Sequence, residues 1–178
     1  NRELEILWGA AGTNIYIDII LIQCYSGWRA SELIKLELSN VSLEEQTFRG
    51  GSKTNAGKDR IVPIHHLIYP LVEKHYREAE RLKSPRLFSI QTFVEGDFSF
   101  IYYELYARQF KVVINRLALD SRHHTHDCRK TFVTMAKRAN VDEYAIKRII
   151  GHQIADLTER VYTDRSIEWL RSEIEKIH

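Results

Sequence analysis

The stretch HTHDCRKTF, residues 124–132, brings together side chains that could do chemistry. His126 and Arg129 are three positions apart, so on a helix they project from the same face of one turn. A helix N-terminus offers free N–H groups and a partial positive charge, and a cation and an imidazole placed there can bind an anion. The pair therefore predicts an anion site, although two exposed polar residues on an ordinary helix would read the same way.

A metal site is a second interpretation of this stretch. It would draw on four potential ligands, His123, His124, His126 and Cys128. Adjacent residues point in different directions, and no second pair at ligand spacing follows. We therefore expect no metal and no cofactor.

Four further polar residues occupy positions where a fold could present them. Arg29 in GWRASEL begins a helix, Lys53 in GGSKTNAG lies in a hairpin turn, and His152 in IIGH follows a helix. Tyr162 in RVYTD comes ten residues later. Each signal is weak alone, since a tyrosine normally packs its ring into the core. Together the residues form the ordered series Arg, Lys, His-x-x-Arg, His, Tyr.

This series resembles the catalytic domain of the tyrosine recombinases, the family of phage integrases and Xer recombinases. The similarity extends from about residue 3 to 175, and HDCRKTF, IIGH and RVYTD are specific in combination. It implies two phosphate-binding arginines, a hairpin lysine, two histidines and a tyrosine nucleophile, namely Arg29, Arg129, Lys53, His126, His152 and Tyr162. Glu32 and Asp127 match positions whose side chains support the catalytic residues without contacting the substrate themselves. Trp28 beside the first arginine, and Cys128 where leucine is more usual, depart from the pattern without removing a functional group.

The chemistry of these residues agrees with strand transfer. In-line attack on a phosphodiester builds negative charge on the non-bridging oxygens, which guanidinium groups bind bidentately without a metal. A tyrosine nucleophile forms a phosphotyrosyl ester, so the strand can be rejoined without ATP. His126 suits the proton acceptor and Lys53 the donor to the leaving 5′-oxygen. The resemblance implies site-specific recombination of double-stranded DNA through a 3′-phosphotyrosyl intermediate.

Two other functions remain open. Residues 132–151 have the apolar spacing of a helix-turn-helix, which would make the protein a DNA-binding regulator, with the helices held together by Ala136, Val141, Ile146 and Ile149. A type IB topoisomerase would use the same chemistry to relax supercoils. All three bind DNA, in agreement with residues 106–150, where ten lysines and arginines stand against four acidic residues.

Hydrophobic periodicity and turn residues predict a mainly α-helical α+β fold with a small antiparallel sheet, the tyrosine recombinase catalytic fold. Gly27 and Gly151 are expected helix stops, and Thr125 and Asp142 expected helix caps. Residues 91–98 are expected to form a loop. The predicted helices are 15–25, 30–37, 67–82, 99–119, 125–140, 143–150 and 166–177, and the predicted strands are 46–49 and 59–63.

Length and composition predict one catalytic domain over residues 1–178. Because the chain begins at Asn1 without methionine, we expect a fragment whose N-terminal DNA-binding domain is absent. Cys24 and Cys128 are too few for a disulfide framework, and we find neither a signal peptide nor a membrane span. We therefore expect a cytoplasmic protein, bacterial or phage-encoded and associated with the nucleoid.

The last predicted helix, within residues 166–178, carries an apolar stripe formed by Ile167, Leu170, Ile174 and Ile177. The stripe can either cover the chain's own core or dock on a neighbouring protomer. The resemblance implies exchange of such C-terminal segments in a homotetramer assembled on DNA.

Overall fold

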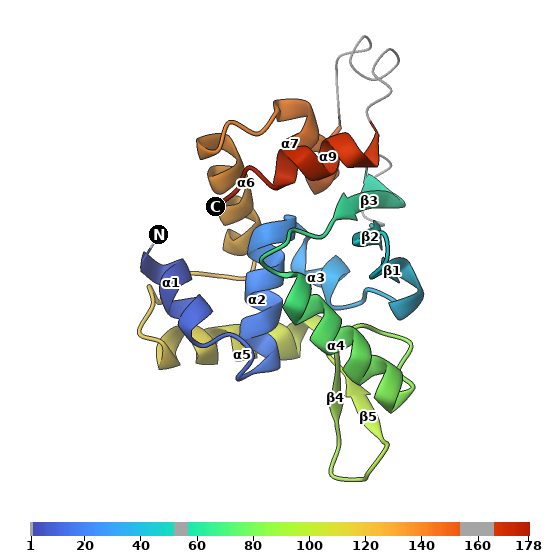
Figure 1. Ribbon diagram of the computed structural model, residues 1–178. Helices are drawn as coiled ribbons and strands as arrows, with labels where there is room; N and C mark the ends of the chain where they lie inside the picture. Colours follow the sequence, from blue (N-terminus) through green and yellow to red (C-terminus); the bar gives the residue numbers. More distant parts are fainter. Residues whose placement is uncertain (1, 52–56, 154–165) are drawn as a thin grey trace.

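The computed structural model describes residues 2–51, 57–153 and 166–178. Helices dominate these residues and are accompanied by two small antiparallel sheets (Figure 1). The predicted α+β class is confirmed. None of the described helices has the length and apolar character needed to cross a membrane.

Helix α2, Ile15–Ser26, lies at the centre of the molecule (Figure 1) and is buried from Tyr16 onward. The Asn14 side chain caps its start by accepting from the Tyr16 N–H, and Gly27 ends it in the left-handed conformation at φ 66°. The bounds agree with the helix predicted at residues 15–25 and with Gly27 as its stop, whereas the Asn14 cap was not predicted. Around α2 pack helices α1, Arg2–Gly9, α4, Tyr69–Leu82, α5, Tyr103–Arg116, and α6, Asp127–Arg138.

The larger sheet has the order β1, β2, β3, formed by Val41–Ser42, Thr47–Gly50 and Arg60–Pro63. Phe48 pairs with Val62 in the register, and both side chains are fully buried. The predicted strands at 46–49 and 59–63 are thus confirmed to within a residue at each end. Short helices α3, Ala30–Leu33, and η1, Leu38–Asn40, connect α2 to this sheet.

The loop expected at residues 91–98 is confirmed over residues 92–97, but the strands on either side of it, which form a second hairpin, were not predicted. Strands β4, Ser89–Gln91, and β5, Phe98–Phe100, pair antiparallel, and the hairpin extends away from the body of the molecule (Figure 1). The Thr92 hydroxyl donates to Asp97 across the turn. Strands of three residues give too short an alternation for sequence reasoning to detect. Helix α5 therefore begins at Tyr103 rather than near residue 99.

Helices α6 and α7 border three of the predicted site residues. His126 directly precedes α6, Arg129 lies on its first turn, and His152 follows the glycine that ends α7. The prediction that Thr125 caps α6 is wrong, because α6 begins at Asp127 and the Thr125 hydroxyl bonds the hydroxyl of Tyr103. In α7, Glu143–Ile150, the Asp142 side chain accepts from two backbone N–H groups, as predicted. Gly151 ends α7 in the left-handed conformation, also as predicted.

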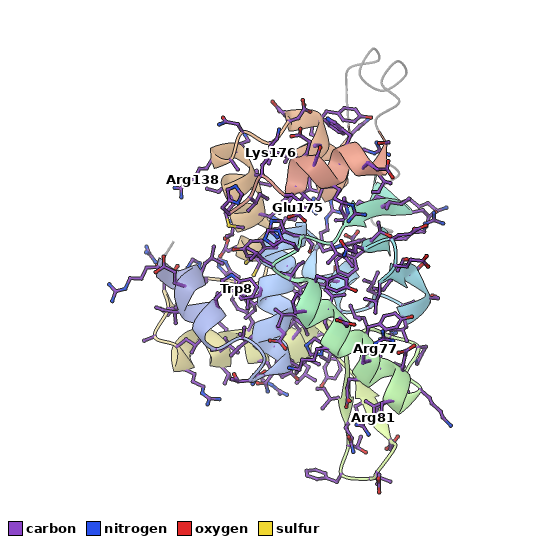
Figure 2. All side chains as sticks on the ribbon, in the orientation of Figure 1. Trp8, Arg77, Arg81, Arg138, Glu175 and Lys176 are labelled. Carbon is purple, nitrogen blue, oxygen red and sulfur yellow. The ribbon has the colours of Figure 1, made fainter. Side chains whose placement is uncertain are left out.

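Helix α9, Ile167–Ile174, packs on β3 and α7 of its own chain (Figure 1). Its apolar stripe is buried at Leu170 and Ile174. His65 Nε2 lies 2.8 Å from the Ile177 carbonyl oxygen, and the His66 backbone N–H donates to Glu175, a residue labelled in Figure 2. In this monomer the stripe covers the chain's own core.

Candidate active site

Arg29 stands at the N-terminal boundary of α3, directly after the turn that ends α2. Its side chain is 16% exposed, and Nη1 donates to Glu32 Oε1 at 3.3 Å, one helical turn away. Arg29 also lines a surface pocket of about 330 Å³ together with Tyr103, Thr125 and His126. The first predicted arginine and the first predicted histidine thus share one pocket.

Arg129 is almost completely buried on the first turn of α6. Nη1 donates to the Gly27 carbonyl at 2.8 Å, and Nη2 donates to the Ile150 carbonyl at 2.5 Å. These bonds place the guanidinium between the last residues of α2 and α7. A guanidinium has five N–H donors, so others remain to bind a phosphate.

Arg60 is a third arginine of the site and was not among the residues predicted from the sequence. Its side chain is 4% exposed, and Nη2 donates to Glu32 Oε2 at 2.9 Å. The guanidinium also donates to the Ile149 and Gly57 carbonyls and lies 3.9 Å from the centre of the Trp28 ring. The sequence did contain a signal, because residues two apart on a strand face the same side and Val62 is a core residue.

These three guanidinium groups and the Glu32 carboxylate form what we call the arginine cluster. Burial, followed by repulsion from Arg29 and Arg60, lowers the pKa of Arg129 to about 10, and Glu32 opposes the shift. Arg129 still carries its charge at neutral pH. Three cations against one carboxylate leave an excess of positive charge, which a phosphate would compensate.

His126 and His152 lie at the edge of the arginine cluster. Burial lowers the pKa of each imidazole below its usual value, and repulsion from Arg129 and Arg29 adds to the shift. His152 follows the left-handed Gly151, and its backbone N–H donates to the Lys147 carbonyl. Both imidazoles are therefore neutral at neutral pH, the form in which a histidine accepts a proton.

The other predicted site residues are Lys53, Tyr162 and Asp127. Lys53 and Tyr162 lie outside the described residues. Burial opposes ionisation of Asp127, but hydrogen bonds from Lys130 and His124 outweigh it and hold its pKa well below the usual range. Asp127 thus joins the start of α6 to the preceding loop, and its support of the active site stays a prediction.

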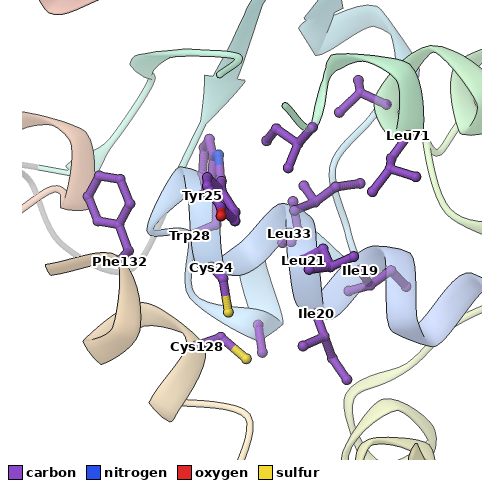
Figure 3. Packing of buried hydrophobic residues seen from close by; sticks show 14 of the residues in the cluster. Ile19, Ile20, Leu21, Cys24, Tyr25, Trp28, Leu33, Leu71, Cys128 and Phe132 are labelled. Carbon is purple, nitrogen blue, oxygen red and sulfur yellow. The ribbon is translucent and has the colours of Figure 1, made fainter. Parts of the chain in front are cut away.

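Two side chains of the alternative metal site, those of His123 and His124, approach the Asp127 carboxylate, whereas His126 and Cys128 lie elsewhere. His123 bonds Glu3 at 3.0 Å and His124 bonds Asp127 at 2.9 Å, while His126 lines the pocket of Arg29. Cys128 is buried, and its sulfur faces that of Cys24 in the core (Figure 3). The described residues of this stretch thus bring together an arginine and an imidazole rather than a ligand set.

Comparison with solved structures finds the same fold in several DNA-processing proteins. The integrase from mycobacterium phage Brujita is 18% identical, with a TM-score of 0.74, over 98% of this chain and 55% of that chain. The XerA recombinase is 24% identical, with a TM-score of 0.70, over 97% of this chain and 61% of that chain. The Tn1549 transposon integrase, in complex with circular intermediate DNA, is 20% identical, with a TM-score of 0.64, over 97% of this chain and 62% of that chain. This chain thus spans roughly three fifths of the length of these proteins.

Sequence comparison gives the family directly. No curated protein matches the chain. The family model described as the phage integrase family matches residues 11–168, which is most of the chain and includes every predicted catalytic position. The chain belongs to the phage integrase family.

Proposed function

We propose that this chain is the catalytic domain of a site-specific recombinase that cleaves and rejoins double-stranded DNA. Arg29 and Arg129 bind the non-bridging oxygens of the reacting phosphate, and Tyr162 attacks the phosphorus to form a 3′-phosphotyrosyl ester. His126 takes the tyrosine proton, Lys53 gives a proton to the leaving 5′-oxygen, and His152 completes the phosphate site. The reaction needs no ATP, because the ester conserves the broken bond for the second DNA hydroxyl.

The observation that carries this proposal is the arginine cluster with its two neutral histidines. The Arg129 guanidinium is held by two carbonyls and that of Arg29 by Glu32, so both need little reorganisation when charge develops on the phosphate. A helix-turn-helix regulator also needs cations to bind DNA. It needs neither a buried arginine hydrogen-bonded to two backbone carbonyls, as Arg129 is, nor imidazoles with lowered pKa values. Family membership and the cluster therefore support recombination over regulation.

The proposed substrate is a specific recombination site, bound in the cytoplasm by four copies of the protein. In this assembly α9 and the residues after it leave their own chain and dock on the neighbouring protomer. The apolar stripe that α9 buries in the monomer supports this exchange, because an equivalent surface is then available on each neighbour.

The test is formation of a covalent adduct. The chain is incubated with a library of nicked duplexes in the presence of EDTA, and the products are separated by denaturing electrophoresis. We expect a protein–DNA adduct that Tyr162→Phe abolishes while DNA binding is nearly unchanged, because only the nucleophilic oxygen is lost. An adduct in the Tyr162→Phe variant would refute the assignment of the nucleophile. Relaxation of supercoiled DNA without joining of two sites would indicate a topoisomerase instead.

A further inference from the structure

We propose that Arg60 is a positioning residue, which engages one oxygen of Glu32, limits the contact between Glu32 and Arg29 to a single hydrogen bond and so leaves the other donors of Arg29 available to the phosphate. The inference rests on the proposed function, because it assigns to Arg60 the control of a phosphate-binding group. Arg60 acts through Glu32 and Arg29 and is not itself placed against the reacting phosphate.

The two oxygens of Glu32 are divided between two arginines. Oε2 accepts from Arg60 at 2.9 Å, whereas Oε1 accepts from Arg29 at the longer distance of 3.3 Å. A carboxylate and a guanidinium prefer two parallel hydrogen bonds when nothing competes. Because Arg60 occupies one oxygen, Arg29 makes a single long bond and keeps most of its donors for a ligand.

Arg60 is itself held on several sides. Its Nε donates to the Ile149 carbonyl at 2.9 Å, its Nη1 donates to the Gly57 carbonyl at 3.0 Å, and its guanidinium lies over the ring of Trp28. A Cβ on Gly51 would lie 2.1 Å from Arg60 Nη1, so the absence of a side chain there makes room for the guanidinium. These contacts fix the Arg60 charge beside Glu32.

The same contacts connect Arg60 to the second phosphate-binding arginine. Ile149 and Ile150 are consecutive residues at the end of α7, and their carbonyls accept from Arg60 and Arg129 respectively. The end of α7, two residues before His152, therefore ties both guanidinium groups to one piece of backbone.

Removal of Arg60 takes away one of the cations that balance the buried Glu32 carboxylate, while Arg29 remains beside it. The side chain of Glu32 is 6% exposed, so solvent cannot replace Arg60. The carboxylate then takes Arg29 through both oxygens and withdraws it from the DNA. Arg60→Met should therefore slow adduct formation by about 100-fold, the scale of losing one transition-state donor.

A double-mutant cycle with Glu32→Gln separates this role from a general loss of structure. A neutral glutamine cannot bind Arg29 as a carboxylate does. The Glu32→Gln/Arg60→Met variant should therefore form adduct at least about tenfold faster than Arg60→Met and within about threefold of the rate of Glu32→Gln. Such non-additivity is the sign of coupled residues in a double-mutant cycle. Asp18→Asn is the matched control, because it removes a buried charge from the far end of α2, where His75 and Lys74 contact it. It should lower stability without changing the rate of the folded protein.

Rates are measured with nicked duplexes under conditions where urea titration shows each variant to be folded. Equal slowing by Arg60→Met in the wild-type and Glu32→Gln backgrounds would overturn the inference, as would a wild-type rate in the single Arg60→Met variant. If Arg60→Met does not fold, the comparison of the double variant with Glu32→Gln decides the same question. Absence of any adduct from the unmodified chain would instead reject the proposed function.

Discussion

Gly151 is a sensitive point of the site, because it ends α7 beside the arginine cluster. Its φ of 66° is strained for any residue with a side chain. A Cβ at Gly151 would lie 2.8 Å from the Gly57 Cα and 3.2 Å from the Arg60 Cδ, inside ordinary van der Waals distance. Alanine at this position must therefore strain the backbone and push the Arg60 strand away from α7.

The two contributions can be separated with a second glycine. Gly96 also has a positive φ, 78°, but an added Cβ there meets nothing within 4 Å. Gly96→Ala should lower the free energy of unfolding by about 1 kcal/mol, the cost of left-handed backbone for an L-residue. Gly151→Ala should lose this amount and an additional ~1–3 kcal/mol for overpacking, about 2–4 kcal/mol in all.

The assay is urea unfolding of both variants, followed by adduct formation where both are folded. We expect Gly151→Ala to slow cleavage at least tenfold, because displacing a catalytic group by about 1 Å is enough to lose up to 100-fold. Gly96→Ala should cleave at the wild-type rate. If the two variants lose the same free energy of unfolding to within about 0.5 kcal/mol, the close approach of α7 to Arg60 does not contribute to the cost of Gly151→Ala.

Three further predictions concern the proposed catalytic groups. Arg29→Ala and Arg129→Ala should each slow adduct formation by about 100- to 1,000-fold. Arg129→Ala should also lower the free energy of unfolding by about 2 kcal/mol more than Arg29→Ala, because it leaves two buried carbonyls without their donor, and equal losses in urea titrations would contradict this. The second-order rate of adduct formation, which reports the free enzyme, should fall at acidic pH with a midpoint below the ordinary histidine value of ~6.5, since burial lowers the pKa of His126 and only the neutral imidazole accepts a proton. A rate that already falls as the pH is lowered from mildly alkaline to neutral would argue against His126 as the base. Lys53→Ala should slow cleavage by about 100- to 10,000-fold. A 5′-bridging sulfur in the DNA should restore the rate of Lys53→Ala but not that of Arg29→Ala, because a thiolate leaves without a proton. The turn SKTNAGK holds a second lysine, Lys58, and rescue of Lys58→Ala instead would assign the acid to Lys58.

The sequence by itself determined the features that depend on neighbouring residues. Asn14 and Asp142 cap helices because their side chains reach backbone N–H groups within three residues. Gly27 and Gly151 end helices because glycine adopts the left-handed conformation without a steric penalty. The strands 47–50 and 60–63 followed from a β-prone pattern on either side of a turn. The ordered series of catalytic residue types, together with its spacing, also identified the family.

Tertiary structure alone decided how the charges of the site are balanced. Arg60 contacts Trp28 and Glu32 beside α3, Gly57 in its own turn, and Ile149 of α7, which is 89 positions away in the sequence. Similarly, the position of α9 on its own core depends on β3 and α7, so the apolar stripe by itself could not distinguish docking in cis from docking in trans. Caps and turns are set by bonds within a few residues, whereas burial and the pKa values of the arginine cluster arise from groups that approach only after the chain has folded.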